Sequence, residues 1–200
     1  MKKMMVIGFT MMLFGFSNVA QATMILSLVE SGNDVIGTVS GSVDTSMLLL
    51  YWPSNCSGYI TPSVGQLTIG GTIQTFTDMW GGLEGPSNFG TGSLGVNADS
   101  GLASSGELTG HFGIFAYYGA VLLQSDYVSG TEITGTSTWN NKTLSDFGIT
   151  EGTYTWTYSD SADAVVLTAA VPEPATAGLL VGAGLLIAAY RRIRRSYGMA

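Results

Sequence analysis

Strict alternation of aromatic and threonine residues near the end of the chain constrains the fold more than any other feature. Tyr154, Trp156 and Tyr158 stand at every second position, and threonines fill the positions between them. Successive side chains of a β-strand point to opposite faces, so the pattern predicts a strand with one aromatic face and one hydroxyl face. A helix, with its period of about 3.6 residues, would spread the rings around its surface. Residues 153–158 are therefore the clearest predicted strand.

Further strand signals fill the middle of the chain, where Gly, Ser and Thr separate short apolar runs. Their spacing of roughly 8–12 residues is typical of all-β sandwiches and barrels. We predict an all-β fold, specifically an antiparallel, jelly-roll-like β-sandwich of two packed sheets. A body of about 150 residues buries a sufficient core without metals or disulfides. The predicted strands cover residues 25–30, 35–43, 47–52, 66–69, 72–80, 112–123, 137–144, 153–158 and 164–171.

Turn residues and apolar runs predict how some of these strands connect. Residues 31–34 and 70–71 are predicted hairpin turns, because Gly, Asn and Asp favour tight turns. The uniformly apolar segment 47–52 predicts a strand buried on both faces. Residues 112–123 predict a central strand pair that turns near Gly119. Residues 81–106 predict a long loop with one or two short strands inside it, since structureless loops of that length are uncommon.

The N-terminus, residues 1–22, has the three parts of a secretory signal peptide. Lys2 and Lys3 form the charged part, and an apolar run follows from residue 4 to residue 16. Ala20 and Ala22 supply the small-x-small cleavage site. We predict cleavage after Ala22 and export of the remainder. The alternative is a buried N-terminal helix or an uncleaved anchor.

The opposite end of the chain contains sixteen uncharged, mostly apolar residues, 175–190. As a helix this segment rises about 24 Å, somewhat less than the ~30 Å hydrocarbon core, and local thinning of the bilayer absorbs the difference. We predict one transmembrane helix, because a core helix with a basic cap would have a polar face. A cytoplasmic stop-transfer cluster follows, by the positive-inside rule, and consists of Arg191, Arg192, Arg194 and Arg195.

Between the two ends lies an acidic body, residues 23–170. It contains thirteen Asp and Glu residues, and Lys142 is its one basic residue, so its formal net charge is minus 12. The whole-chain value of minus 7 hides this imbalance, because most of the basic residues belong to the two ends. An acidic body repels phosphate backbones, which argues against nucleic acid as a partner.

The body offers few residues for a catalytic site. Its one histidine, His111, has no supporting spacing to Asp78 or Asp126, and the Gly-x-Ser-x-Gly motif of many hydrolases is absent. We interpret His111 as a surface or strand-edge residue and predict that the body is not an enzyme. A glycosidase pair of carboxylates stays open, because thirteen acids offer many pairs. The single Cys56 excludes an intrachain disulfide and is interpreted as a small buried hydrophobe.

No cofactor or metal site is predicted. One Cys and one His argue against zinc, whereas calcium is compatible with loop carboxylates and carbonyls. Residues 90–95 match Gly-x-Gly-x-x-Gly, but their Gly, Ser and Asn surroundings indicate a turn-rich loop rather than a dinucleotide site. Sugar stacking is an alternative to core packing for the aromatic residues, which are Tyr51, Trp52, Tyr59, Trp80, Trp139, Tyr154, Trp156 and Tyr158.

A short proline motif connects the body to the apolar segment. Pro172-Glu173-Pro174 is followed at once by residues 175–190 and then by the arginine cluster. The prolines fix φ and lack N–H donors, so the motif favours an extended peptide just outside the membrane. Such a peptide suits a protease-type cleft, and a rigid stalk is a compatible interpretation.

In this three-part order, residues 171–196 resemble the PEP-CTERM sorting signal of Gram-negative bacteria. The resemblance implies that an exosortase, an integral-membrane relative of cysteine transpeptidases, is a partner that recognises the motif and processes the chain. It also implies an association with exopolysaccharide and biofilm. A segment of this kind is sometimes labelled an ice-binding protein C-terminal domain. The segments 127–130, 144–150 and 152–158 are similar to a block found in many PEP-CTERM proteins.

Together these features predict a membrane-anchored precursor that is exported across the inner membrane to the cell surface, outer envelope or extracellular matrix. The body is expected to be a non-catalytic structural or adhesive protein of that surface or of the exopolysaccharide matrix. The alternative is a carbohydrate-binding or glycan-processing surface protein. A third hypothesis is ice binding through Thr153, Thr155 and Thr157, which requires a flat repeated array, and the sequence contains no internal repeat.

Overall fold

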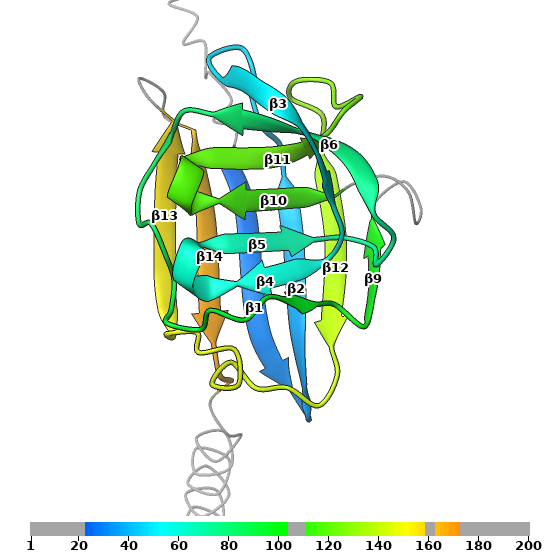
Figure 1. Cartoon of the computed structure of the whole chain (residues 1–200), viewed down its shortest axis with the longest axis vertical. Coiled ribbons are helices and arrows are strands. Elements are labelled where there is room, and N and C mark those ends of the chain that lie inside the picture. Colours follow the sequence, from blue (N-terminus) through cyan, green and yellow to red (C-terminus); the bar gives the residue numbers. More distant parts are fainter. Residues whose placement is uncertain (1–22, 104–110, 159–162, 173–200) are drawn as a thin grey trace, which may run out of the picture.

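The computed structural model describes residues 23–103, 111–158 and 163–172. These residues form a sandwich of two seven-stranded sheets, which confirms the all-β prediction. The strands of one sheet run crosswise to those of the other (Figure 1), an arrangement known from orthogonally packed sandwiches. The predicted signal peptide, the apolar segment 175–190 and the arginine cluster lie outside the described residues.

Sheet A contains the first and last strands of the body. Its order is β7 (Leu83–Glu84), β13 (Gly152–Tyr158), β14 (Ala164–Ala170), β1 (Thr23–Ser31), β2 (Asp34–Gly41), β12 (Ile133–Trp139) and β9 (Ser100–Ala103). The pair β1–β14 is parallel, a departure from the antiparallel prediction. Parallel neighbours need a long connection, and the whole body separates these two strands in the chain. Thr23 and Ala170 therefore lie at opposite ends of the sheet.

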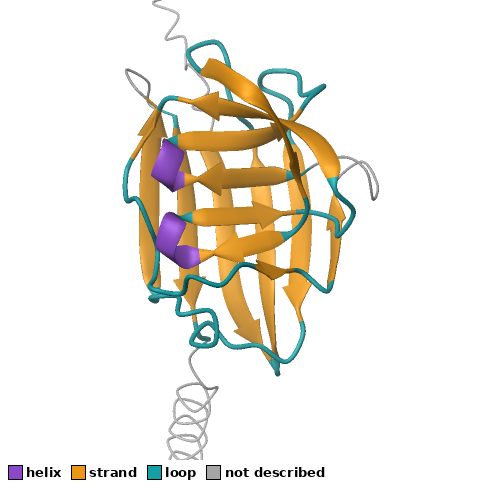
Figure 2. Cartoon of the chain, viewed as in Figure 1, coloured by secondary structure: helices purple, strands orange, loops and turns teal. Residues whose placement is uncertain are grey.

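Sheet B lies in front of sheet A in Figure 1. Its order is β3 (Leu49–Cys56), β6 (Thr75–Gly81), β11 (Ala120–Gln124), β10 (Phe112–Phe115), β5 (Gln66–Ile69), β4 (Tyr59–Thr61) and β8 (Val96–Asn97), and every pair is antiparallel. Two single-turn 3₁₀ helices connect neighbouring strands at the same end of the sheet B strands (Figure 2): η1 (Pro62–Val64) joins β4 to β5, and η2 (Ala116–Tyr118) joins β10 to β11. Short strands do lie within residues 81–106, as predicted, but the described part of this segment contains three of them, β7, β8 and β9, rather than one or two.

Two of the predicted turns are confirmed. Ser31 pairs with Asp34, so Gly32 and Asn33 form the two-residue turn between β1 and β2, and Gly32 takes the left-handed φ of 65°. Gly119, with φ of 56°, ends η2 and directs the chain from β10 back along β11. Glycine adopts this conformation without the strain that a Cβ would introduce.

The predicted hairpin at Gly70 and Gly71 is wrong, because β5 pairs with β4 and β10 whereas β6 pairs with β3 and β11. The two glycines instead make room for His111. A Cβ on Gly70 would lie 2.6 Å from the imidazole of His111, and the Gly71 carbonyl accepts a hydrogen bond from that ring. The Ser137 hydroxyl binds both the N–H and the carbonyl of Gly70.

The prediction that residues 47–52 form a doubly buried strand is also wrong. Leu49, Tyr51 and Trp52 are 67%, 42% and 47% exposed, because β3 is an edge strand of sheet B. Pro53 explains the position, since a residue without an N–H is tolerated at the edge of a sheet and not in its centre. The pairing of β3 with β6 also shifts register between Leu50 and Trp52.

The remaining strands agree with the sequence to different degrees. The alternation of residues 153–158 is confirmed, because Trp156 and Tyr158 are buried whereas the threonines are exposed. Strand β14 confirms the predicted last strand. The strand predicted at 137–144 lies earlier, as β12, and the chain turns after Trp139 through Asn141, whose φ is 52°. The core between the sheets includes the fully buried rings of Phe89, Phe112, Trp139 and Trp156.

Candidate functional site

The C-terminal end of the body is the first candidate site. Strand β14 ends at Ala170, and the exposed Val171 and Pro172 continue the chain directly from it. The Val171 N–H donates a 3.4 Å hydrogen bond to the carboxylate of Glu151, which holds the first exposed residue against the sheet. Glu173 and Pro174 lie outside the described residues. The proline motif therefore begins two residues after the last strand, with no folded linker between them.

The second candidate site is the outer face of sheet B. Residues directly opposite each other on paired strands point to the same face. One such row crosses the whole sheet and consists of Asn97, Tyr59, Thr68, Gly113, Leu122, Met79 and Trp52. Their chain neighbours Ile60, Leu67, Ile114 and Val121 belong to the core between the sheets, so the row faces away from that core. Cys56, Met79, Ala120 and Leu122 form a small apolar cluster of their own on this outer face.

A polar hollow of about 240 Å³ opens on this face. Its lining comes from three neighbouring strands, from the end of β3 and from the residue before β6, and it includes no charged side chain. The lining residues are Asn55, Cys56, Ser57, Tyr59, Gln66, Thr68, Gln74 and Asn97. Thr68 is fully buried, and its hydroxyl has no hydrogen-bond partner. We call this feature the amide hollow.

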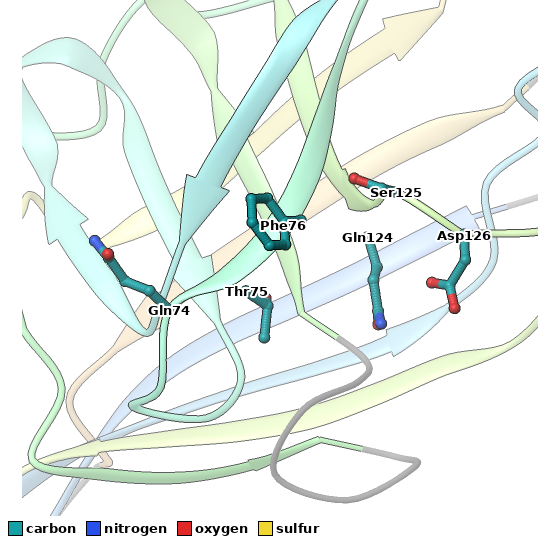
Figure 3. A pocket seen from close by; sticks show the side chains of 6 residues that line it. All are labelled: Gln74, Thr75, Phe76, Gln124, Ser125 and Asp126. Atoms are coloured by element: carbon teal, nitrogen blue, oxygen red, sulfur yellow. The ribbon is translucent and has the colours of Figure 1, made fainter.

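A second hollow of about 460 Å³ shares Gln74 with the amide hollow. It is centred on Phe76, which is 76% exposed, and Asp126 gives it a charged side chain. In Figure 3 the side chains of Gln124 and Asp126 extend in the same direction, whereas Gln74 points away from them. The two hollows thus differ in charge, because Asp126 lines the second one and no charged residue lines the amide hollow.

A group of rings lies beside the amide hollow, and we call it the aromatic patch. It consists of Tyr51, Trp52, Phe115, Tyr117 and Tyr118. All of its rings are exposed except that of Phe115, which is partly buried. Trp52 stacks on Tyr51 at 5.5 Å and meets Tyr118 edge-on at 6.0 Å, measured between ring centroids. Tyr118 also contacts Phe115 at 4.7 Å and Tyr117 at 5.2 Å. Phe115 pairs directly with Gln66 of the amide hollow, so the two features are continuous.

The family comparison concerns the end of the chain. A family model described as the PEP-CTERM protein-sorting motif matches residues 170–195. The chain carries a PEP-CTERM sorting motif. An exosortase recognises such motifs, so this chain is an exported protein with a membrane-associated precursor. The match begins at Ala170, the last residue of β14. The sorting signal therefore starts where the folded body ends.

The other comparisons concern the whole chain of this PEP-CTERM protein. No curated protein and no solved structure matches it. Within residues 23–103, 111–158 and 163–172, no helix has the length and apolar character needed to cross a bilayer. In the same residues, no three His, Cys, Asp or Glu side chains come together in a group that fits a metal ion.

The histidine of the body is not at the surface, which corrects the interpretation drawn from the sequence. His111 is fully buried, and its Nε2–H donates to the Gly71 carbonyl at 2.9 Å. A carbonyl only accepts, so Nδ1 of the neutral ring accepts from the Thr75 hydroxyl at 3.2 Å. The structure brings neither Asp78 nor Asp126 into these hydrogen bonds; Asp78 accepts instead from Ser125. His111 therefore has the contacts of a structural residue.

His111 makes the stability of the body depend on pH. Burial lowers its pKa from 6.5, although the bond to Gly71 acts in the opposite direction. The folded body favours the neutral ring, so the contribution of His111 to stability is complete at pH values above the pKa of this histidine in the unfolded chain. The contribution is lost as the pH falls below that pKa, because the unfolded chain then binds a proton more readily than the folded body does. We expect the melting temperature to fall between pH 7.5 and pH 5, and the His111→Gln variant to lose this dependence. Thermal unfolding of both proteins followed by circular dichroism measures it, and equal pH profiles would contradict the assignment.

Cys56 has the environment predicted for it. The side chain is 6% exposed, and burial raises the pKa of its thiol to about 12. A thiol with so high a pKa is protonated at neutral pH and is a weak nucleophile. Cys56 therefore acts as part of the apolar cluster on the outer face of sheet B.

The structure divides the candidate sugar-stacking residues into buried, partly buried and exposed groups. Trp80 and Tyr154 are partly buried and pack against the core, and Tyr59 lines the amide hollow. Trp139, Trp156 and Tyr158 are buried in the core, and the indole N–H of Trp156 donates to the Pro86 carbonyl at 2.7 Å. Tyr51 and Trp52 instead join the aromatic patch, together with Tyr117 and Tyr118, which the sequence did not single out. The amide hollow was missed as well, because its residues are far apart in the chain and only strand pairing brings them together.

The exposed threonines of β13 extend a hydroxyl row across the outer face of sheet A. Thr153, Thr168, Ser27, Thr38 and Thr136 stand opposite one another on successive strands. The next row contains Thr155, Val166, Ile25, Ser40 and Thr134, so the hydroxyl pattern does not repeat from row to row. Ice binding requires a flat, repeated array, and a twisted sheet with mixed rows does not supply one.

Proposed function

We propose that this exported protein acts, after processing by an exosortase, as a non-catalytic structural or adhesive component of the cell surface or exopolysaccharide matrix. The observation that carries the proposal is the sorting motif that follows the last strand of a folded, acidic body. In this arrangement the body is the cargo, and the two ends deliver it.

The delivery part of the proposal assigns a role to each end. Residues 1–22 act as a signal peptide cleaved after Ala22, with Ala20 in the second small position. Residues 175–190 span the inner membrane, and the arginine cluster, residues 191–195, stays in the cytoplasm. Support comes from the charge distribution, since all basic residues except Lys142 belong to these ends.

The sorting part depends on the chemistry of Pro172, Glu173 and Pro174. Two prolines keep the peptide extended, because they fix φ and cannot donate the hydrogen bonds of a helix. An extended peptide beside the bilayer suits the cleft of a membrane-embedded transpeptidase, and Glu173 offers it a charge to recognise. The exposed Val171 and Pro172, held beside Glu151, support access to this segment.

The absence of catalysis is part of the proposal and has three supports. The neutral ring of His111 is engaged by Gly71 and Thr75, which leaves it unable to act as a base for a surface serine. Cys56 is buried and its thiol has a raised pKa. A paired-carboxylate mechanism would need two acids facing each other across a cleft, and the amide hollow is lined by neutral residues.

The proposal is tested by locating the mature body in the producing bacterium. Cells are fractionated into inner membrane, outer envelope and polysaccharide matrix, and the body is detected with an antibody. We expect it in the envelope or matrix fraction. The control is a chain with both ends intact whose body is replaced by an unrelated β-sandwich, which should be delivered but not retained in the matrix. Equal retention of both proteins would contradict an adhesive role for the body.

Carbohydrate binding is the second candidate function for the body. It is favoured by the aromatic patch, where Trp52, Tyr117 and Tyr118 are between 45% and 67% exposed. Exposed rings offer the apolar surface on which sugar rings stack. This candidate keeps the same export route and differs only in what the body contacts outside the cell.

A further inference from the structure

We propose that the outer face of sheet B binds a neutral oligosaccharide, which lies across the amide hollow and the aromatic patch. The inference rests on the proposed function only in placing the body outside the cell. It goes further by assigning the site, the residues and the class of ligand.

The lining of the amide hollow is the first argument. Asn55, Gln66, Gln74 and Asn97 each carry an amide that both donates and accepts hydrogen bonds. Ser57, Tyr59 and Thr68 add hydroxyl groups with the same double capacity. A ligand whose groups also donate and accept, without charge, matches this surface. Neutral sugars have that chemistry, because each ring presents several hydroxyl groups.

The floor of the hollow provides an independent argument. The Thr68 side chain is 0% exposed, and its hydroxyl has no partner. It lies over Gly113, where a Cβ would come within 2.8 Å of the Thr68 oxygen. A buried polar group without a partner is unfavourable. The described residues contain four such side-chain atoms, and the Thr68 hydroxyl is the one that lines the amide hollow. A ligand hydroxyl that enters the hollow would supply the missing hydrogen bond.

The aromatic patch extends the surface toward β3. Trp52 belongs to the same cross-strand row as Tyr59 and Thr68, and Phe115 stands opposite Gln66. Seven strands at a spacing of about 4.8 Å give the row a length of roughly 29 Å. The combination suits an extended oligosaccharide better than a single sugar, with rings stacked at one end and hydroxyl groups bound at the other.

The charge of the body selects against acidic glycans. Thirteen acids and one lysine give the body a net charge of minus 12, so an anionic chain is repelled at a distance. The amide hollow adds no basic side chain to offset that repulsion. The second hollow, around Phe76, contains Asp126 and is a less suitable place for the same ligand.

The test uses the full chain reconstituted in lipid nanodiscs and isothermal titration calorimetry. The probes are four neutral hexasaccharides, built of β-1,4-glucose, α-1,4-glucose, β-1,3-glucose or N-acetylglucosamine, and an anionic hexamer of galacturonic acid. We expect saturable binding of at least one neutral hexamer, and at least tenfold weaker binding of the anionic one. Failure of all four neutral hexamers to bind, or preferred binding of the anionic hexamer, would overturn the proposal.

Three variants locate the site. Trp52→Ala and Asn97→Ala should each raise the Kd about tenfold, the usual effect of losing one good stacking or hydrogen-bonding contact. Thr68→Val removes the unpartnered hydroxyl at nearly constant shape, so we expect an equal or higher melting temperature together with a several-fold higher Kd. If Thr68 had only a structural role, the melting temperature would fall whenever the Kd rose. Unchanged Kd in all three variants would overturn the assignment of the site.

Two control variants complete the experiment. Ile25→Ala changes a 54% exposed apolar residue on the outer face of sheet A and should leave the Kd unchanged. Phe76→Ala changes the exposed ring of the second hollow and should also leave it unchanged; a loss confined to Phe76→Ala would move the site there and contradict the proposal. Calorimetry uses purified protein, so a lack of sugar binding would contradict this proposal without bearing on delivery. A failure of delivery would be seen only in the cell fractionation.

Discussion

Replacement of Trp156 by alanine is expected to lower the free energy of unfolding of the body by about 3–5 kcal/mol, the range found for buried aromatic residues. The indole is fully buried in the core, and its N–H is satisfied by the Pro86 carbonyl. The substitution leaves a large cavity and also deprives that carbonyl of its donor. Gly85 packs so closely against the ring that its own Cβ would lie 2.5 Å from it, so this part of the core fits around the indole.

Urea denaturation followed by circular dichroism measures this effect. The matched control is Trp52→Ala, the same substitution at a 47% exposed position on the edge strand β3. It removes contacts with Tyr51 and Tyr118 but leaves no core cavity, so we expect a loss of about 1 kcal/mol or less. Equal losses in the two variants would show that the alternation in β13 does not mark the interior of the sandwich.

Substitution of all three residues Pro172, Glu173 and Pro174 by alanine is expected to stop maturation. Without the prolines, the segment loses its constraint to extended backbone, and without Glu173 it loses the one charge between β14 and the apolar segment. We expect the precursor to accumulate in the inner membrane with little mature protein released. The readout is the ratio of precursor to mature chain in fractionated cells.

Two controls separate recognition from folding in this experiment. Glu151→Ala removes the carboxylate that binds the Val171 N–H and should leave maturation largely intact, since the motif itself is unchanged. The melting temperature of the triple variant should match that of the parent chain, because the substituted residues follow the last strand. Normal maturation of the triple variant would contradict the role assigned to the motif.

Local patterns predicted local structure well. The alternation of aromatic residues and threonines predicts that Trp156 and Tyr158 share one face of a strand, and in the structure this is the buried face of β13. Gly32 and Asn33 fixed the β1–β2 turn, since few residues adopt the backbone conformation that a two-residue hairpin requires. In both cases neighbouring residues determine the outcome.

Long-range pairing was beyond the reach of the same patterns. The segment 47–52 is as apolar as a core strand, but its position at the edge of sheet B leaves it exposed. The ring of His111 is buried against Gly70 and hydrogen-bonded to the Gly71 carbonyl, and both glycines lie about 40 residues earlier in the chain. The sequence alone does not indicate which distant residues will become neighbours through strand pairing.

The same reason explains what was missed at the candidate sites. The sorting motif is contiguous, so its three parts can be recognised in order along the chain. The amide hollow joins Asn55, Thr68 and Asn97 through the pairing of β4 with β5 and β8 and through the path of β3. The unpartnered hydroxyl of Thr68, which is the strongest sign of a ligand, is visible only in three dimensions.

The most direct test of the division into two delivery segments and an exported acidic body is the intact mass of the protein from its native envelope. The account predicts a mature chain that begins at Thr23 and has lost the arginine cluster, with a peptide mass clearly below the 20.9 kDa of the full chain. A 20.9 kDa species that still begins at Met1 and is recovered from the cytosol would contradict it.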